Sequence, residues 1–232
     1  MLPGSVALVT GASRGIGQAV AVELGRRGVH VVALARTQGG LEETDDAIRA
    51  VGGQTTLLPQ DLMDGPALDP LGPSLYARFG RLDILVHAAA VLGKLTPVGH
   101  ITPKDWDNVV GVNLSAAWRL VRTLDPLLRR SPAGRAVFLA DSRAREPWAY
   151  WGAYGATKAG LDYLALTWAQ EVQAMGLKVN LFDPGPVAGA LHGGAFPGLN
   201  PAAMTQPADV APAIADLCEP AEQRAGATVR RA

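Results

Sequence analysis

Residues 10–17 read TGASRGIG, from Thr10 to Gly17, and lie between two patterns that decide the fold. The apolar run before them, residues 6–9, is short and β-branched, which is typical of a buried parallel strand. The pattern after them is helical, with Ile16, Val20 and Leu24 on one side. The stretch therefore predicts a strand, a glycine-rich turn and a helix.

Three glycines shape this turn, with the spacing Gly-x-x-x-Gly-x-Gly rather than that of the common dinucleotide fingerprint. Gly11, Gly15 and Gly17 lack Cβ atoms, so the backbone can come close to a pyrophosphate. The N–H groups and the positive end of the new helix would face that anion. The turn thus predicts an anion-binding loop, although the same glycines could serve only to pack the helix under the strand.

Composition indicates a compact chain without a global charge. Apolar residues make up 48% and charged residues 18% of the 232 residues, which allows a sizeable core. Lys plus Arg and Asp plus Glu number 21 each, so no net charge attracts nucleic acid or an anionic membrane. We expect one domain over residues 1–232, with no nucleic-acid partner and no membrane partner.

The chain shows no sign of secretion. Its first residues lack a basic region, and no apolar run approaches the roughly 18 residues that span a membrane. The single cysteine, Cys218, excludes an intramolecular disulfide and is expected to be a small core residue. A cytoplasmic protein is therefore expected.

Short apolar runs alternate with helical patterns along the rest of the chain. Strands are expected at 6–10, 29–35, 54–58, 82–87, 136–140, 178–182 and about 227–229. The lengths of the connections favour right-handed βαβ units, with helices on both faces and a ligand crevice at the carboxyl ends of the strands. The predicted fold is α/β, a Rossmann-type doubly wound sheet of seven parallel strands.

A second motif, Tyr154-Gly-Ala-Thr-Lys158, begins a later helical pattern. Side chains four residues apart share one face of a helix, so Lys158 should lie against Tyr154. A free phenol titrates at about pH 10, and a neighbouring cation favours its ionised form. The pair is a candidate for exchanging the proton when a ketone and an alcohol interconvert.

The glycine turn and the Tyr-x-x-x-Lys pair together resemble the short-chain dehydrogenase/reductase family, over Val6 to about Val229. Leu92-Gly93 and residues 151–154, Trp-Gly-Ala-Tyr, look like its YciK-like branch. The resemblance implies hydride transfer between a nicotinamide cofactor and a small carbonyl or alcohol substrate, in a homodimer or homotetramer. Trp118 and Trp168 could anchor such an interface or could be buried core residues.

The same resemblance implies which residues bind the cofactor. These are Gly11, Ser13, Arg14, Gly15, Ile16, Gly17, Arg36, Asp61, Leu62, Ala88, Ala89, Tyr154, Lys158, Pro184, Gly185 and Val187. In the family the residue at the position of Asp61 meets the adenine, although Asp61 could instead make only a local turn bond.

The second strand ends in Arg36, where an acidic residue would bind a ribose 2′-hydroxyl. Arg36 and Arg14 offer planar guanidinium groups that match a 2′-phosphate, unless both are only solvated surface residues. We therefore expect NADP(H) to be favoured over NAD(H).

The catalytic set implied by the resemblance is Asn113, Ser142, Tyr154 and Lys158. In relatives the matching Asn kinks its helix and holds a water that links the lysine to solvent. The family's serine stands thirteen residues before the tyrosine, a position that Asp141 takes here, whereas Ser142 stands twelve before. An ionised Asp141 would oppose phenolate formation, so we expect it to turn away or be protonated and Ser142 to reach inward.

Further departures from the family pattern concern the cofactor site. Ala88 and Ala90 stand where relatives have Asn and Gly, and Gly189 where many have Thr. They support an alternative function, a dinucleotide-binding protein with little or no catalysis. His87 has no ligand-like neighbour, so it is expected to be structural, and no metal site is predicted. Residues 184–206, rich in Gly, Pro and Ala, are expected to form a substrate lid unless they are a surface excursion.

Overall fold

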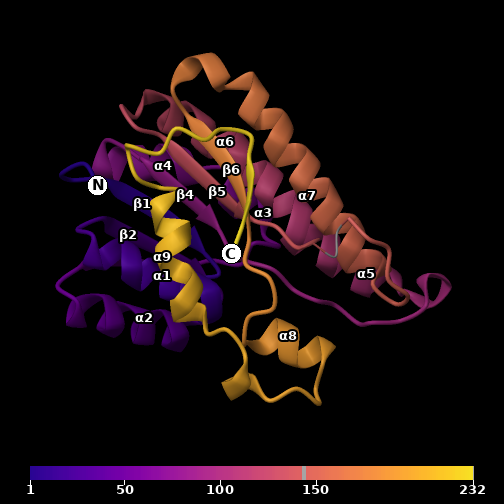
Figure 1. The fold of residues 1–232 in the computed structure, drawn as a ribbon. Coiled ribbons are helices and arrows are strands. Elements are labelled where there is room, and N and C mark those ends of the chain that lie inside the picture. Colours follow the sequence, from indigo (N-terminus) through magenta and orange to yellow (C-terminus); the bar gives the residue numbers. More distant parts are fainter. Residues whose placement is uncertain (143–144, 232) are drawn as a thin grey trace.

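The computed structural model describes residues 1–142 and 145–231, in which strands and helices alternate (Figure 1). The strands are β1 (Val6–Thr10), β2 (His30–Ala35), β3 (Gln54–Pro59), β4 (Ile84–His87), β5 (Arg135–Leu139), β6 (Lys178–Asp183) and β7 (Thr228–Arg230). The helices are α1 (Gly15–Arg26), α2 (Gln38–Ala50), α3 (Gly65–Leu68), α4 (Leu71–Phe79), α5 (Pro103–Val110), α6 (Ala116–Arg130), α7 (Gly152–Glu171), α8 (Ala190–Ala195) and α9 (Pro207–Asp216).

The strands form one seven-stranded sheet in the order β3-β2-β1-β4-β5-β6-β7. Every neighbouring pair is parallel. The chain adds strands on one side of β1 as far as β3 and then continues on the other side with β4. At such a reversal the carboxyl ends of two neighbouring strands open a crevice. The predicted doubly wound fold is confirmed, and the crevice lies between the ends of β1 and β4.

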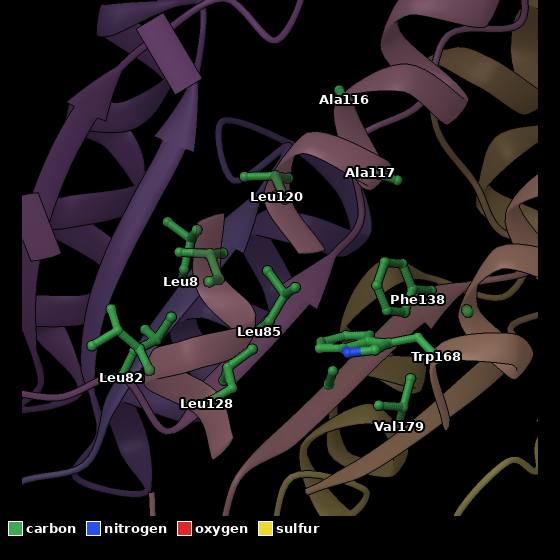
Figure 2. Packing of buried hydrophobic residues seen from close by; sticks show 14 of the residues in the cluster. Leu8, Leu82, Leu85, Ala116, Ala117, Leu120, Leu128, Phe138, Trp168 and Val179 are labelled. Carbon is green, nitrogen blue, oxygen red and sulfur yellow. The ribbon is translucent and has the colours of Figure 1, made fainter. Parts of the chain in front are cut away.

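Helices cover both faces of the sheet because side chains alternate across each strand. In β1, Leu8 belongs to one hydrophobic cluster, while Ala7 and Val9 belong to the other. Residues of α4, α6 and α7 complete the first cluster, and residues of α1, α2 and α9 complete the second (Figure 1). Figure 2 shows the first cluster, in which the ring of Trp168 stands edge-on to Phe138, with centroids 6.1 Å apart.

Trp118 and Trp168, each expected to be either an interface anchor or a core residue, differ in burial. Trp168 is 3% exposed, and its indole Nε1 donates to Asp125 Oδ1 at 2.9 Å, so it is a core residue. Trp118 is 46% exposed, and two arginine side chains lie over its ring. Cys218 is buried in the second cluster, as expected, and burial raises the pKa of its thiol to about 12.

The helical region formed by α5 and α6 is irregular in the middle. Between α5 and α6 the residues Gly111–Ser115 form a π-helical turn. Such a turn widens the helix locally and is frequent at functional sites. It contains Asn113, the residue that the family resemblance marks as a kink.

Candidate active site

One cleft of about 390 Å³ lies at the carboxyl ends of the strands, and every residue predicted to bind the cofactor borders it. These residues come from β1–α1, from the ends of β2, β3 and β4, from α7 and from the segment after β6. The two other residues of the predicted catalytic set, Asn113 and Ser142, lie outside its lining. The parallel topology therefore brings residues from the whole length of the chain to one edge of the sheet.

The glycine turn leaves room where it faces the cleft and is tight where it meets the sheet. Gly11 has a φ of +67°, and a Cβ there would lie 2.8 Å from Ala89 Cα. Gly15 has a φ of +58°, and a Cβ there would extend into open space. A Cβ on Gly17 would collide with the carbonyl oxygen of Gly11, so this glycine lets α1 pack against the end of β1. The packing role is therefore confirmed for Gly17, while the open backbone at Gly15 is compatible with the anion-binding role, which stays a prediction.

Two arginines mark one end of the cleft, which we call the nucleotide end. Arg14 precedes the first residue of α1, and Arg36 follows β2 directly. Both side chains are exposed, and both residues border the cleft beside Ser13 and Thr37. Asp61 also borders the cleft, and its Oδ1 accepts a hydrogen bond from the Met63 backbone N–H at 2.9 Å. Asp61 thus makes the local turn bond that the sequence allowed, while it keeps a place at the cleft.

The floor of the cleft is formed where β4 ends. The Ala89 N–H donates to Thr10 Oγ1 at 3.2 Å, and the same hydroxyl lies 3.0 Å from His87 Nδ1. His87 is 1% exposed, and its Nε2 has no hydrogen-bond partner among the described residues. Burial, together with the positive charge of Lys158, lowers the pKa of His87 to about 3. A neutral imidazole that ties β4 to β1 agrees with the structural role expected for His87.

Tyr154 and Lys158 occupy the first turns of α7 and mark the other end of the cleft, which we call the reacting end. Lys158 Nζ lies 6.0 Å from the centroid of the Tyr154 ring and donates to the Leu139 carbonyl oxygen at 2.8 Å. Burial lowers the pKa of Lys158 to about 8, although Asp141, Asp162 and Asp183 oppose this shift. At neutral pH the lysine is therefore mainly charged, and it places a cation beside the phenol.

Asp141, not Ser142, lies against Tyr154. The Tyr154 hydroxyl donates to Asp141 Oδ2 at 2.9 Å, and Asp141 borders the cleft. Ser142 is exposed and borders a separate hollow beside Pro186 and Arg230. Of the two alternatives expected for Asp141, turning away is wrong for this structure, and so is the inward position expected for Ser142; protonation of Asp141 stays a prediction. The physical reason is that strand-like pairing continues past β5, where the Ala140 N–H donates to the Phe182 carbonyl oxygen. Because the chain begins to turn only at Ser142, Asp141 is still placed by the strand.

Asn113 lies outside the lining of the cleft but hydrogen-bonds a residue that borders it. Its side-chain Oδ1 accepts from the Val91 N–H at 2.8 Å, and its Nδ2 donates to the Val91 carbonyl at 2.9 Å. The same Nδ2 donates to Thr157 Oγ1 at 3.2 Å, which connects it to α7 beside Lys158. Val91 borders the cleft, so the π-helical turn holds one of its walls. Thr157 carried no signal in the sequence, since its role arises only from the packing of two helices.

The segment after β6 covers the reacting end. Gly185 has a φ of +65°, and its N–H donates to Asp183 Oδ1 at 3.1 Å, which directs the chain across the cleft. A bridge between Val187 and Thr205 closes the base of the excursion. Within it the short helix α8 borders the cleft through Ala190, Leu191 and His192. The predicted segment 184–206 therefore contains a helix that the sequence did not indicate, and His192 is a cleft residue that it missed.

Aromatic rings join α8 to the start of α7. The ring of Trp151 stands edge-on to Tyr154 with centroids 5.6 Å apart, and it lies 6.0 Å from Phe196. His192 lies 4.9 Å from Phe196 in turn. Packing of this kind fixes the position of the covering segment relative to the tyrosine.

The described part of the chain holds no group of three or more His, Cys, Asp or Glu side chains that could bind a metal ion. None of its helices is long and apolar enough to cross a membrane.

Comparison with known proteins agrees with this geometry. The family model for short chain dehydrogenases matches residues 5–198. The "Uncharacterized oxidoreductase YciK" of Escherichia coli is 34% identical over 215 residues, which cover 91% of this chain and 85% of YciK. A short chain dehydrogenase structure from Salmonella enterica is 31% identical with a TM-score of 0.93, and the match covers 99% of this chain and 96% of that one. A protein from Shigella flexneri solved in complex with NADP is 32% identical with a TM-score of 0.91, covering 99% and 97%.

The chain belongs to the short-chain dehydrogenase/reductase family, whose members are NAD(P)-dependent oxidoreductases. Its cleft fits a nicotinamide dinucleotide. The open backbone at Gly15 and the start of α1 suit a pyrophosphate, and the two exposed arginines suit a further phosphate. Tyr154 and Lys158 lie at the opposite end, where a reacting group would be held.

Proposed function

We propose that this protein transfers a hydride between NADP(H) and a small carbonyl or alcohol substrate. The observation that carries the proposal is the placement of Tyr154 and Lys158 at one end of a cleft whose other end presents Arg14 and Arg36. Bound nicotinamide would supply or accept the hydride. The chain itself must then bind the cofactor, orient the substrate and move one proton.

Tyr154 is the proposed proton donor and acceptor. When a carbonyl is reduced, the Tyr154 hydroxyl gives its proton to the substrate oxygen, and the reverse transfer accompanies alcohol oxidation. The Lys158 ammonium stabilises the phenolate that remains, because an opposite charge favours the ionised form. Asn113 positions α7 through Thr157 and, as in relatives, is expected to hold a water that returns the proton from solvent.

The proposed cofactor contacts are made by residues that border the cleft from its nucleotide end to its reacting end. Backbone N–H groups from Ser13 to Gly17 would hold the pyrophosphate, while Arg14 and Arg36 would hold the 2′-phosphate. Asp61 and Leu62 would border the adenine, Ala88 and Ala89 the adjoining ribose. Lys158 would hold the second ribose. Pro184, Gly185 and Val187 would meet the nicotinamide, with residues 184–206 acting as a lid.

A second candidate function is dinucleotide binding with little or no catalysis. One observation favours it: a carboxyl group rather than a hydroxyl accepts from Tyr154. As a carboxylate, Asp141 would hold the phenolic proton back and could not donate to a substrate oxygen. We favour the enzyme, because Tyr154 and Lys158 border the cleft and Asn113 hydrogen-bonds Val91, which also borders it.

We further propose a cytoplasmic homodimer or homotetramer. Trp106, Trp118 and Tyr163 are large exposed side chains on α5, α6 and α7, which in this family commonly form subunit interfaces. Exposed tryptophan and tyrosine residues are typical anchors of such contacts.

A panel of ketones and alcohols, each offered with NADP(H) and with NAD(H), tests the proposed activity by nicotinamide absorbance. Turnover of at least one pair with NADP(H), and slower turnover with NAD(H), is expected. Tight NADPH binding without turnover of any compound would support the second candidate instead.

A further inference from the structure

Asp162 is a buried acidic residue that the proposed proton transfer does not use. It lies on α7 and is 8% exposed. Its Oδ2 lies 3.6 Å from Arg145 Nη2, whereas its Oδ1 is buried and has no hydrogen-bond partner among the described residues. Burial of a carboxylate is costly unless nearby cations compensate it. A carboxyl group held in this place by one ion pair therefore requires an explanation.

Asp162 continues the spacing of the Tyr-x-x-x-Lys motif. Tyr154, Lys158 and Asp162 follow one another at intervals of four and are all buried, so each is a neighbour of the next on the surface of α7. Side chains in a helix lean toward its N-terminus, so the Asp162 carboxyl group leans toward the turn that carries Lys158. Lys158 leans in the same way toward Tyr154, and its Nζ lies 6.0 Å from the centroid of that ring. The helix thus places a carboxyl group, an ammonium and a phenol in sequence.

We infer that Asp162 is a positioning residue for the proposed reaction, whose negative charge keeps Lys158 in the ammonium form. The inference rests on the proposed function, because that function uses the ammonium to stabilise the Tyr154 phenolate. Asp162 does not border the cleft, so it acts on the reaction only through Lys158.

Lys158 needs this support because it is removed from water. The residue is 4% exposed, and its Nζ donates to the carbonyl oxygen of Leu139. Burial lowers the pKa of Lys158 to about 8, although nearby carboxylates oppose this shift. Loss of one of these negative charges would bring the pKa close to neutrality, where much of the lysine would be uncharged.

Other titratable and charged groups surround Lys158 and Asp162. They lie at the carboxyl ends of the strands or in the segments that follow: His87, Asp141, Arg145, Asp183 and, 3.9 Å from Asp183, Arg230. Burial, with the charge of Lys158, lowers the pKa of His87 to about 3, so this ring stays neutral. Burial raises the pKa of Asp162, and the charges of Arg145 and Lys158 oppose that shift. Asp162 and Lys158 therefore stabilise each other's charged forms.

Asp162 can be changed without altering the lining of the cleft. Asp141 accepts from Tyr154, and Asp183 Oδ1 accepts from the Gly185 N–H, so both of these carboxyl groups bond residues that border the cleft. Neither Asp162 nor its partner Arg145 borders it. Replacing Asp162 therefore changes the charge near Lys158 and leaves the lining as it is.

Nuclear magnetic resonance of the lysines tests the inference without substrate or cofactor. The sequence has four lysines, Lys94, Lys104, Lys158 and Lys178, so lysine labelled with carbon-13 at Cε gives few signals, and Lys158→Arg assigns the one in question. Asp162→Asn should lower the titration midpoint of Lys158 by about 0.5 pH unit or more, as expected for loss of a unit charge one helical turn away.

Two further variants separate charge from packing. Asp162→Glu keeps the charge but adds a methylene group, so the midpoint should stay within about 0.2 pH unit of the wild-type value. Glu171→Gln removes an exposed charge at the end of the same helix and should also leave it unchanged. The inference is overturned if Asp162→Asn leaves the midpoint in place, or if Asp162→Glu lowers it as far as Asp162→Asn does.

A measurement on the wild-type protein does not depend on the folding of any variant. Because electrostatic coupling is reciprocal, the carboxyl carbon of Asp162 should show an inflection at the midpoint of Lys158. A flat signal through that pH range would also overturn the inference.

Turnover tests the consequence for the reaction. With NADPH and a ketone that the wild-type protein reduces, the alkaline limb of kcat against pH should move to lower pH in Asp162→Asn, by as much as the lysine midpoint moves. A shifted midpoint with an unshifted limb would overturn the positioning role. Absence of turnover with every ketone would instead contradict the proposed function, and the lysine titration would still decide whether Asp162 holds the charge of Lys158.

Discussion

The nucleotide end of the cleft presents backbone together with two arginines, whereas the reacting end presents polar side chains that lie close to one another. At the nucleotide end, Gly11 and Gly15 have positive φ values and the N-terminus of α1 follows, so the anion site proposed there would depend largely on backbone conformation. At the reacting end the Tyr154 hydroxyl donates to Asp141, and Lys158 Nζ lies 6.0 Å from the centroid of the Tyr154 ring.

This difference indicates which end of the cleft can change its ligand specificity more easily. A backbone site tolerates many neighbouring substitutions because its donors are present in every residue except proline. A side-chain site can change its preferred substrate through one replacement, because each of its groups belongs to a single residue. We therefore expect substitutions at the two ends to have separable effects.

Tyr154→Phe should have the largest effect on activity, and this effect should be confined to the reacting end. Removing the phenolic proton donor is expected to lower kcat by about 10³-fold, within the range for loss of a general acid. The dissociation constant for NADPH, measured by fluorescence titration, should stay within about threefold. Tyr76→Phe is the control, because Tyr76 lies on α4, outside the cleft lining, and is 46% exposed. A comparable loss of NADPH affinity in Tyr154→Phe would show that the two ends are not separable.

Arg36→Asp should act at the nucleotide end alone. Charge-assisted hydrogen bonds contribute roughly 1.5–3 kcal/mol each, so NADPH should bind at least tenfold more weakly. The new carboxylate should bind the bare ribose of NADH and repel a 2′-phosphate, which reverses the cofactor preference. Dissociation constants for both cofactors check this, with Arg78→Asp, an exposed arginine on α4, as the control. An unchanged preference would mean that Arg36 is only a solvated surface residue.

His87→Asn should leave the chemistry of both ends in place and change stability, since His87 supports the floor that they share. The folded pKa of about 3 lies below the unfolded value near 6.5, so the unfolded chain binds the extra proton first. Stability from this residue is fully present above pH 6.5 and is lost as the pH falls toward 3. By pH 5 the difference is roughly 1–2 kcal/mol. Urea unfolding at pH 7.5 and pH 5 should show a smaller decrease for His87→Asn than for the wild type. The exposed His100→Asn should behave like the wild type.

The sequence was sufficient for the sheet and the nucleotide end because both depend on local patterns. Apolar runs separated by helical patterns predicted all seven strands, with small errors such as β4, which begins at Ile84 rather than at residue 82. The glycine turn and Arg36 follow directly from strand ends, so their positions needed no knowledge of packing.

The reacting end was harder to predict because it depends on the residue at which the alternation of side chains along β5 ends. Whether Asp141 or Ser142 faces Tyr154 was decided by one further backbone hydrogen bond beyond β5. The thirteen-residue spacing from Tyr154 was a usable signal for Asp141, since the structure keeps that spacing despite the expected charge repulsion. The helix α8 was missed because its six residues include Gly193 and Gly194 and carry no amphipathic pattern.

Because Cys218 is buried, its reaction with a thiol reagent reports local opening of the fold. A thiol reagent attacks the thiolate, and a thiol with a pKa of about 12 beneath α9 offers almost none at neutral pH while the fold is closed. Because the sequence has one cysteine, every labelled molecule records an opening that exposed Cys218, which lies just after α9 in the second hydrophobic cluster. The labelling rate at increasing reagent concentration thus yields both the frequency and the free energy of that event, with no engineered probe.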